Sequence, residues 1–151
     1  MSTISIELAH SVTAEADEAF SAFHDVKARK FLMADYVKDV GVEGSGVGSI
    51  YRMYVDNETV CGCVVELTEF FDADLREMRV RMIDTGNVVP FADYRSQVVV
   101  QSAGEGQSIV VIRSTFLPLG VARTAAEAIA RENYTAVLRR LDQYLIGDKN
   151  D

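Results

Sequence analysis

The sequence predicts an α+β fold in which a curved, seven-stranded antiparallel sheet wraps around one long C-terminal helix. The helix is indicated by the stretch from 121 to 145, which contains no Gly or Pro. Pro118 and Gly120 precede this stretch and Gly147 follows it, as helix start and stop signals do. Before it, strand-like segments follow one another through short links, and such links favour antiparallel pairing.

The first part of the chain predicts one strand followed by two short helices. Apolar and polar residues alternate over 4–12, which is typical of a half-buried strand. Thr13 is the expected N-cap of the first helix, because its hydroxyl can accept a backbone N–H. The second helix is expected over 28–34, with Phe31 and Leu32 turned inward.

Six further strands are predicted from alternation between turn signals. Their ranges are 38–43, 49–55, 60–71, 76–84, 93–102 and 108–117. The Gly-rich run 44–48 and the segment 103–106 have the composition of turns. The longer connection 85–92 is unusually apolar for a loop, so we expect it to pack against the fold or to close over a site.

Composition restricts the class of protein. A length of 151 residues fits a single domain over 1–151 that can bury a proper core. The net charge of -8 disfavours a nucleic-acid surface, which would need a basic face. No apolar run long enough for a signal peptide or a membrane span is present, so a cytoplasmic location without membrane insertion is expected.

The two cysteines and two histidines do not predict a metal site. Cys61 and Cys63 lie two positions apart in a strand-like run and are interpreted as buried thiols. His10 ends a run of inward positions and is interpreted as a satisfied core residue, with a catalytic role as the alternative. His24 is expected to face solvent. We therefore predict no metal and no cofactor.

The C-terminal helix predicts where a cavity lies. Its inward stripe is small or polar at Ala126, Ala130 and Asn133, and bulky at Leu141 and Leu145. Packed on a curved sheet, the bulky half fills the interior and the small half leaves a hollow. A cavity is therefore expected beside the first half of the helix.

Alternation along the strands predicts an inner face that is apolar with a few polar interruptions, as in small-molecule pockets. The polar positions are Lys38, Tyr94, Ser96 and Ser114, joined by Asn133 of the helix. The full set of expected ligand-binding residues is Lys38, Val40, Tyr51, Met53, Val64, Glu66, Met78, Val80, Pro90, Tyr94, Ser96, Ile112, Ser114, Ile129 and Asn133. By the same alternation Val42 shares the inner face with Lys38 and Val40.

The order of elements resembles the helix-grip fold of the START and birch-pollen-allergen superfamily, also called SRPBCC. The segments that carry the resemblance are 46–49, the Glu66 strand with its end at 71–76, and 90–96. The last of these is similar to the start of the sixth strand in the polyketide cyclase/dehydrase-like branch. This branch includes the plant abscisic-acid receptors, but 56–59 and the 85–92 loop lack their gate signatures, so hormone reception is not implied.

The resemblance implies three polar pocket positions, Lys38, Glu66 and Tyr94, which are also the candidate catalytic residues. Two of them have other interpretations. Glu66 lies on the less apolar of the two faces of its strand. The pattern alone therefore turns it outward, unless a β-bulge intervenes. Lys38 could instead extend from an edge strand into water.

Three functions remain open at this point. The first is a carrier or sensor that encloses a small hydrophobic or polyketide-like molecule. The second is a cofactor-independent enzyme of the cyclase/dehydrase type, in which Glu66 accepts a proton while Lys38 and Tyr94 stabilise the oxyanion. The third is a protein-interaction module, which an exposed apolar patch would favour. A homodimer is left open, and no nucleic-acid partner is expected.

Overall fold

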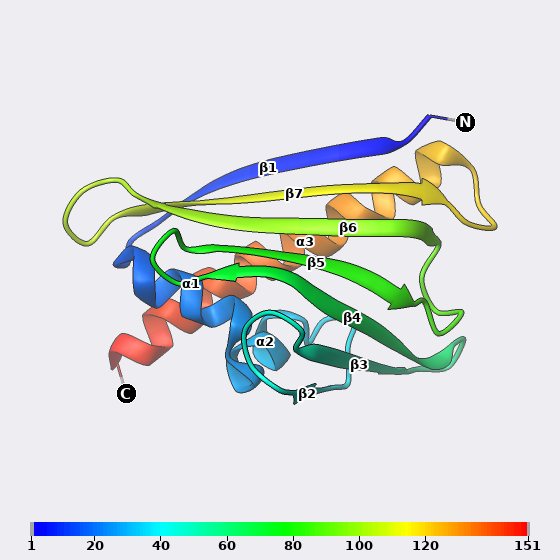
Figure 1. The fold of residues 1–151 in the computed structure, drawn as a ribbon, viewed down its shortest axis with the longest axis horizontal. Coiled ribbons are helices and arrows are strands. Elements are labelled where there is room, and N and C mark those ends of the chain that lie inside the picture. Colours follow the sequence, from blue (N-terminus) through cyan, green and yellow to red (C-terminus); the bar gives the residue numbers. More distant parts are fainter. Residues whose placement is uncertain (1, 151) are drawn as a thin grey trace.

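Figure 1 shows the computed structural model, which describes residues 2–150, with side chains through 147. One antiparallel sheet has the strand order β1-β7-β6-β5-β4-β3-β2. The strands are β1 (Ile4–Val12), β2 (Asp39–Glu43), β3 (Ile50–Asp56), β4 (Cys61–Asp72), β5 (Glu77–Asp84), β6 (Phe91–Ser102) and β7 (Ser108–Pro118). Their bounds differ from the predicted ones by no more than two residues.

Three helices complete the fold. They are α1 (Ala16–His24), α2 (Val26–Leu32) and α3 (Arg123–Asn150). Figure 1 shows α3 running across one face of the sheet, with α1 and α2 beside its C-terminal part. The predicted seven-stranded sheet, two short helices and long C-terminal helix are therefore confirmed, although α3 continues beyond the predicted end at residue 145.

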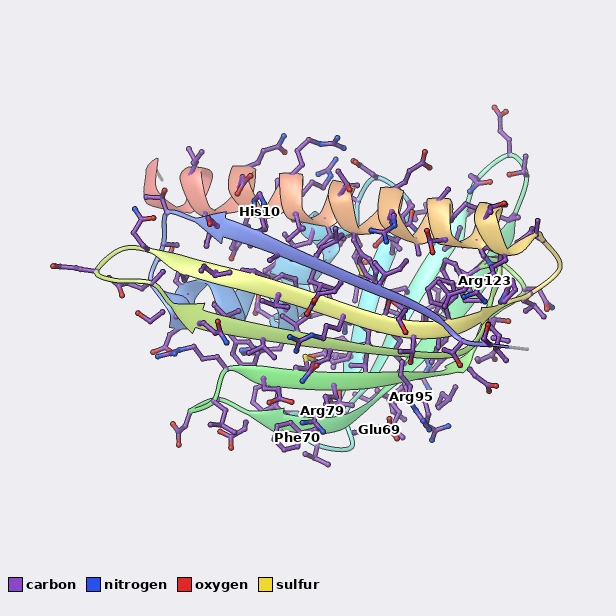
Figure 2. All side chains as sticks on the ribbon, turned by 90° about the horizontal axis from the view of Figure 1, so that it is seen from above. His10, Glu69, Phe70, Arg79, Arg95 and Arg123 are labelled. Atoms are coloured by element: carbon purple, nitrogen blue, oxygen red, sulfur yellow. The ribbon has the colours of Figure 1, made fainter. Side chains whose placement is uncertain are left out.

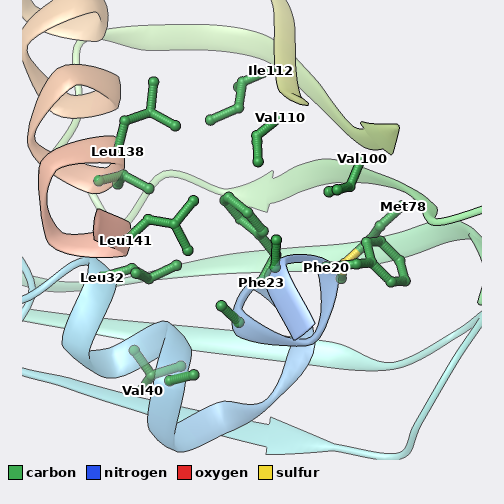
Figure 3. Close-up of a cluster of buried hydrophobic side chains, with 14 of the residues drawn as sticks. Phe20, Phe23, Leu32, Val40, Met78, Val100, Val110, Ile112, Leu138 and Leu141 are labelled. Atoms are coloured by element: carbon green, nitrogen blue, oxygen red, sulfur yellow. The ribbon is translucent and has the colours of Figure 1, made fainter. Parts of the chain in front are cut away.

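The largest group of buried side chains lies where α1 and α2 meet the C-terminal half of α3 and the sheet (Figure 3). Phe20, Leu32 and Leu141 are almost completely buried there. Truncating a side chain at such a position costs about 2–5 kcal/mol, because the transfer energy is lost and a void remains. The bulky half of α3 is thus occupied by core packing, as predicted.

A smaller group of buried side chains gathers at the other half of α3. Phe91 of β6 and Phe116 of β7 lie with their ring centroids 4.6 Å apart, and Ala126 packs in the same cluster. Two regions of core therefore lie along the helix, and the space between them is where the site described below is found.

Three local predictions were wrong. The N-cap residue of α1 is Glu15 rather than Thr13, and its carboxylate accepts the backbone N–H of Gly106 at 2.8 Å instead of capping its own helix. Phe31 was expected inward but is 36% exposed, because its side chain lies at the surface between α2 and α3, with the Arg140 guanidinium 5.1 Å from its ring centroid. Cys61 is exposed, because it lies at the beginning of β4 and not within its buried part.

The loop between β5 and β6 is fixed by two glycines. A Cβ on Gly86 would lie 2.3 Å from the carbonyl oxygen of Cys63, and a Cβ on Gly62 would lie 2.4 Å from the carbonyl oxygen of Gly86. Gly86 also has a φ of +61°, a conformation that other residues adopt at a cost. The loop can therefore approach the backbone of β4 only with glycine at both positions, and this approach carries Val88 and Val89 toward the interior.

We predict that Gly86→Ala destabilises the fold much more than Gly46→Ala. Gly46 has a similar φ of +66°, but a Cβ there meets nothing within 4 Å. The free energy of unfolding of the Gly46→Ala control should therefore fall only by the cost of placing Ala in a left-handed conformation, about 1–2 kcal/mol. The Gly86 variant should lose roughly twice that or more in the free energy of unfolding, measured by urea denaturation. Equal losses would show that the loop does not press against β4.

Candidate functional site

A cavity of about 120 Å³ lies between the inner face of the sheet, α2 and the middle of α3. Most of its lining is apolar. The predicted ligand-binding residues that line it are Met53, Val64, Glu66, Met78, Val80, Tyr94, Ser96, Ile112 and Asn133. The structure thus brings residues from β3, β4, β5, β6, β7 and α3 together around one enclosed space.

The position of the cavity along α3 agrees in part with the prediction from side-chain sizes along this helix. Ala130 and Asn133 line it, followed by Tyr134 and Val137 on the next turn. Ala126 was expected beside the hollow, but it packs in the aromatic cluster one turn earlier. Leu141 and Leu145 belong to the filled core and do not line the cavity.

The other predicted ligand-binding residues do not line the cavity. They are Lys38, Val40, Tyr51, Pro90, Ser114 and Ile129. Lys38 precedes β2 at the edge of the sheet, and its ammonium lies 3.2 Å from Asp56 Oδ2 in solvent. A lysine that reaches water and a partner at the surface avoids the cost of burial, so the inward prediction was wrong. Val42 is likewise exposed on this short edge strand.

Glu66 does face the interior, with 5% of its surface exposed. The register of β4 against β5 shifts between Val65 and Glu66 and again between Thr68 and Phe70. Val64, Glu66 and Thr68 alternate on the buried face of β4, and only beyond the second shift does the alternation change, so that Phe71 packs against the core. The orientation implied by the resemblance is therefore the one that the structure has.

The partner of Glu66 is Arg29 of α2, which the sequence analysis missed. Arg29 Nη2 donates to Glu66 Oε1 at 2.8 Å, and both residues line the cavity. The Arg29 guanidinium also lies 4.1 Å from the ring centroid of Tyr51. A usable signal was present, because Arg29 lies three positions before the inward Leu32 and so shares its helix face.

This ion pair leaves one donor free. Arg29 Nη1 is buried and has no hydrogen-bond partner among the described residues. An unsatisfied buried donor costs about 1–3 kcal/mol, more when it belongs to a charged group. The pair is therefore a buried polar centre beside an apolar space, with one donor left unsatisfied.

A second polar centre is formed by tyrosines. The hydroxyl groups of Tyr94 and Tyr134 make a short hydrogen bond across the cavity wall, where Ser96 also lies. Burial raises the pKa of both phenols, and nearby hydroxyls, that of Ser114 first, partly oppose the rise at Tyr134. Burial likewise raises the pKa of Tyr36, a third lining phenol. All three side chains are therefore uncharged hydrogen-bonding groups at neutral pH.

The histidines lie outside this site. His10 Nε2 is 2.9 Å from Asp142 Oδ1 and connects β1 to α3 near the surface (Figure 2). His24 was expected to face solvent, but it is half-buried with its ring centroid 5.0 Å from that of Phe71. Burial lowers the pKa of His24.

Among the side chains of residues 2–147, no group of three or more His, Cys, Asp or Glu comes together as a metal site. No helix within the same range is both long and apolar enough to cross a bilayer.

A curved antiparallel sheet that encloses a cavity against one long helix defines a class of ligand-binding folds. The chain belongs to the family described as polyketide cyclase / dehydrase and lipid transport, whose model matches residues 3–145. The resemblance to the SRPBCC superfamily and its helix-grip fold is thus confirmed. Comparison with curated proteins gives no match.

Solved structures of similar shape have low sequence identity. The Zhui aromatase/cyclase from Streptomyces sp. R1128 has a TM-score of 0.80 at 16% identity, over 95% of this chain and 93% of that chain. Norcoclaurine synthase from Thalictrum flavum, in complex with dopamine and hydroxybenzaldehyde, has a TM-score of 0.75 at 17% identity, over 97% of this chain and 88% of that chain. Ara h 8.0201 has a TM-score of 0.79 at 11% identity, over 97% of this chain and 99% of that chain. At such identities the likeness shows the fold alone.

We predict strong coupling between Arg29 and Glu66 in a double-mutant cycle. Arg29→Met leaves the Glu66 carboxylate buried without its partner and should cost about 3–5 kcal/mol in the free energy of unfolding. Adding Glu66→Gln should recover a large part of this loss, because no buried charge then remains. Urea denaturation of the two single variants and the double variant measures the coupling.

A matched control for this cycle is available on the opposite face of the sheet. Arg79 Nε donates to Glu77 Oε2 at 2.5 Å, and Figure 2 shows Arg79 beside Phe70 on the side turned away from α3. The Arg79 side chain is 54% exposed and the Glu77 side chain 15% exposed, so water screens this pair more than the Arg29–Glu66 pair, and Arg79→Met with Glu77→Gln should couple more weakly. Additive losses at Arg29 and Glu66 would contradict a buried, mutually dependent pair.

Proposed function

We propose that this protein binds a small, mainly apolar molecule in the cavity between the sheet and α3, as a carrier or sensor. The observation that supports this most directly is the cavity with its apolar lining, in which Arg29 and Glu66 are the only charged residues among those that the structure describes. Such a space, with a few polar groups that fix orientation, is the usual form of a small-molecule site.

The size of the cavity limits the ligand. An apolar cavity of roughly 150 Å³ in another protein binds benzene, and the cavity here is about 120 Å³. In this conformation it suits a molecule of about one aromatic ring. A larger polyketide-like molecule would require the lining to move. The lining residues outside the helices and strands are Met33, Tyr36, Val37 and Val89.

The polar groups favour binding over proton transfer. Glu66 is the one carboxylate of the lining among the described residues, and its Oε1 already accepts from Arg29. No His, Lys, Cys or Asp side chain from the described residues lines the cavity. A general base would have to be a carboxylate held in an ion pair, which is a poor starting point for catalysis.

An enzyme of the cyclase/dehydrase type is the second candidate. It is favoured by Tyr94 and Tyr134, whose uncharged hydroxyls face the same cavity as Glu66 and could stabilise an oxyanion. Lys38 has no part in this version, because it lies in solvent. Incubation with short β-ketoacyl thioesters distinguishes the two candidates, since cyclisation with dehydration lowers the substrate mass by one water while binding alone does not.

Native mass spectrometry of freshly purified protein tests the proposal. We expect a retained small molecule that is released when the complex is activated by collision. If none is retained, titration with single-ring aromatic compounds followed by protein NMR should give saturable shifts at the lining residues. The absence of both would refute the proposal.

We predict that Ala130→Leu abolishes ligand retention without loss of stability. Ala130 is buried against the cavity, so the larger side chain has empty space to occupy. Ala128→Leu is the matched control, because Ala128 is exposed on the same helix and the ligand should be kept. Thermal unfolding and native mass spectra measure the two effects. A loss of several kcal/mol in Ala130→Leu, as in an overpacked core, would show that no usable cavity is present.

A further inference from the structure

A second pocket, of about 340 Å³, lies where the sheet opens between β5 and β6, and its lining is mainly polar. Arg81 and Arg95 form the last residue pair between these strands, although β5 continues to Asp84. On the β6 side the register against β7 shifts between Ala92 and Arg95. Figure 1 shows the end of β5 turning away from β6. We call this opening the outer pocket.

Met82 connects the outer pocket to the cavity described above, because it lines both. It pairs with Glu66 of β4 but has no paired residue on β6, and it packs against both groups of buried side chains. A methionine side chain is unbranched and has three rotatable bonds, so it can adopt other rotamers. A change in the rotamer of Met82 can therefore join the outer pocket to the apolar cavity.

Two arginines bring accessible donors to the outer pocket. The side chains of Arg81 and Arg95 line it and are 40% and 65% exposed. Arg81 donates from Nε to Glu69 Oε2 at 3.2 Å, whereas Arg95 Nε lies 3.7 Å from Glu69 Oε1, which is too far for a hydrogen bond. The terminal nitrogens of both guanidinium groups have no hydrogen-bond partner among the described residues. Figure 2 shows Arg95 and Glu69 on the side of the sheet turned away from α3.

The charges at this place favour a singly charged anion. Glu69 serves two guanidinium groups, and like charges directly opposite each other on neighbouring strands repel. An anion between Arg81 and Arg95 would reduce this repulsion, and a guanidinium group can hold a carboxylate through two parallel hydrogen bonds. Asp93 also lines the pocket, so the two nearby carboxylates oppose a doubly charged anion more than a singly charged one.

We infer that the outer pocket binds the carboxylate of an apolar acid, whose hydrocarbon part passes Met82 between β5 and β6 and ends in the cavity. Arg81 and Arg95 donate to the carboxylate, and the apolar lining of the cavity holds the other end. This inference rests on the proposed function and names the class of ligand. It also assigns the opening in the sheet as the place where the polar end of the ligand remains in contact with water.

Acids paired with their primary amides test the inference. Phenylacetate, 4-phenylbutyrate and 6-phenylhexanoate differ in chain length, and each amide has the shape of its acid without the charge. Protein-observed NMR titration at neutral pH gives Kd for each compound. The acid should bind about three- to tenfold more tightly than its amide once the chain is long enough to pass Met82, and the ratio should be smallest for phenylacetate. Raising the salt concentration to about 0.5 M should reduce this advantage.

Intermolecular nuclear Overhauser effects show whether one molecule occupies both spaces. The ring protons of 4-phenylbutyrate should contact the methyl groups of Val80 and Ile112 in the cavity, and its methylene chain should contact the methyl group of Met82. Ring contacts to outer-pocket residues alone would contradict the inference, since the apolar end would then lie outside the cavity.

Paired charge variants identify the donors. Arg81→Gln with Arg95→Gln should remove the advantage of each acid over its amide and leave amide binding unchanged. The matched control is Arg79→Gln with Arg113→Gln, which removes the same charge from the outer face away from the pocket and should keep most of the advantage. Circular dichroism confirms that both variants are folded.

The reverse change is available at Asp93. Its φ is +50°, a conformation that Asn adopts about as readily as Asp, so Asp93→Asn removes a negative charge from the pocket without straining the bulge. The acids should then bind about two- to threefold more tightly while the amides are unaffected. Unchanged or weaker binding of the acids would contradict a carboxylate at this place.

The possible outcomes separate the inference from the proposed function. Equal affinity of acid and amide at every chain length, or an acid advantage that survives Arg81→Gln with Arg95→Gln, overturns the inference. Amide binding with ring contacts to Ile112 then still upholds the cavity as a ligand site. Failure of all the acids and amides to bind the wild-type protein overturns both.

Discussion

One guanidinium and one carboxylate, buried side by side in an apolar interior, constrain the rest of this structure. Neither charge is stable there without the other, so α2 must keep Arg29 against Glu66 of β4. Tyr51 supports the guanidinium with its ring, and its hydroxyl donates to the backbone carbonyl of His24 at 2.7 Å, where α1 gives way to α2. The short helices are thereby held to the sheet by polar contacts as well as by packing, and they form a fixed wall of the cavity.

The opposite wall is set by side-chain size along α3. Leu141 fills the space near α1 and α2. Ala130 lies about three turns earlier on the same helix, and its small side chain leaves room for the cavity. Tyr134 reaches from the helix to Tyr94 of β6 and closes the cavity with a polar contact. The cavity is therefore lined by an ion pair and neutral phenols among apolar side chains.

The fold could be predicted because its signals are local: alternation marks strands and a long stretch without Gly or Pro marks the helix. The site depends on contacts that alternation does not describe. Glu66 lies on the less apolar face of β4, and it is this face that is buried; Arg29 is tolerated inside only because Glu66 of another element meets it. Lys38 was placed inside by alternation and resemblance, but β2 begins one residue later and water is within reach at that edge. The ligand-binding role of these residues remains a prediction.

The central claim is that the interior holds a mainly apolar site between the sheet and α3. A crystal structure of the protein under xenon pressure tests it most directly, because xenon enters dry apolar cavities of this size. The account predicts a xenon atom among Met78, Val80 and Ile112, near Ala130. A structure in which these side chains meet one another and exclude xenon would contradict it.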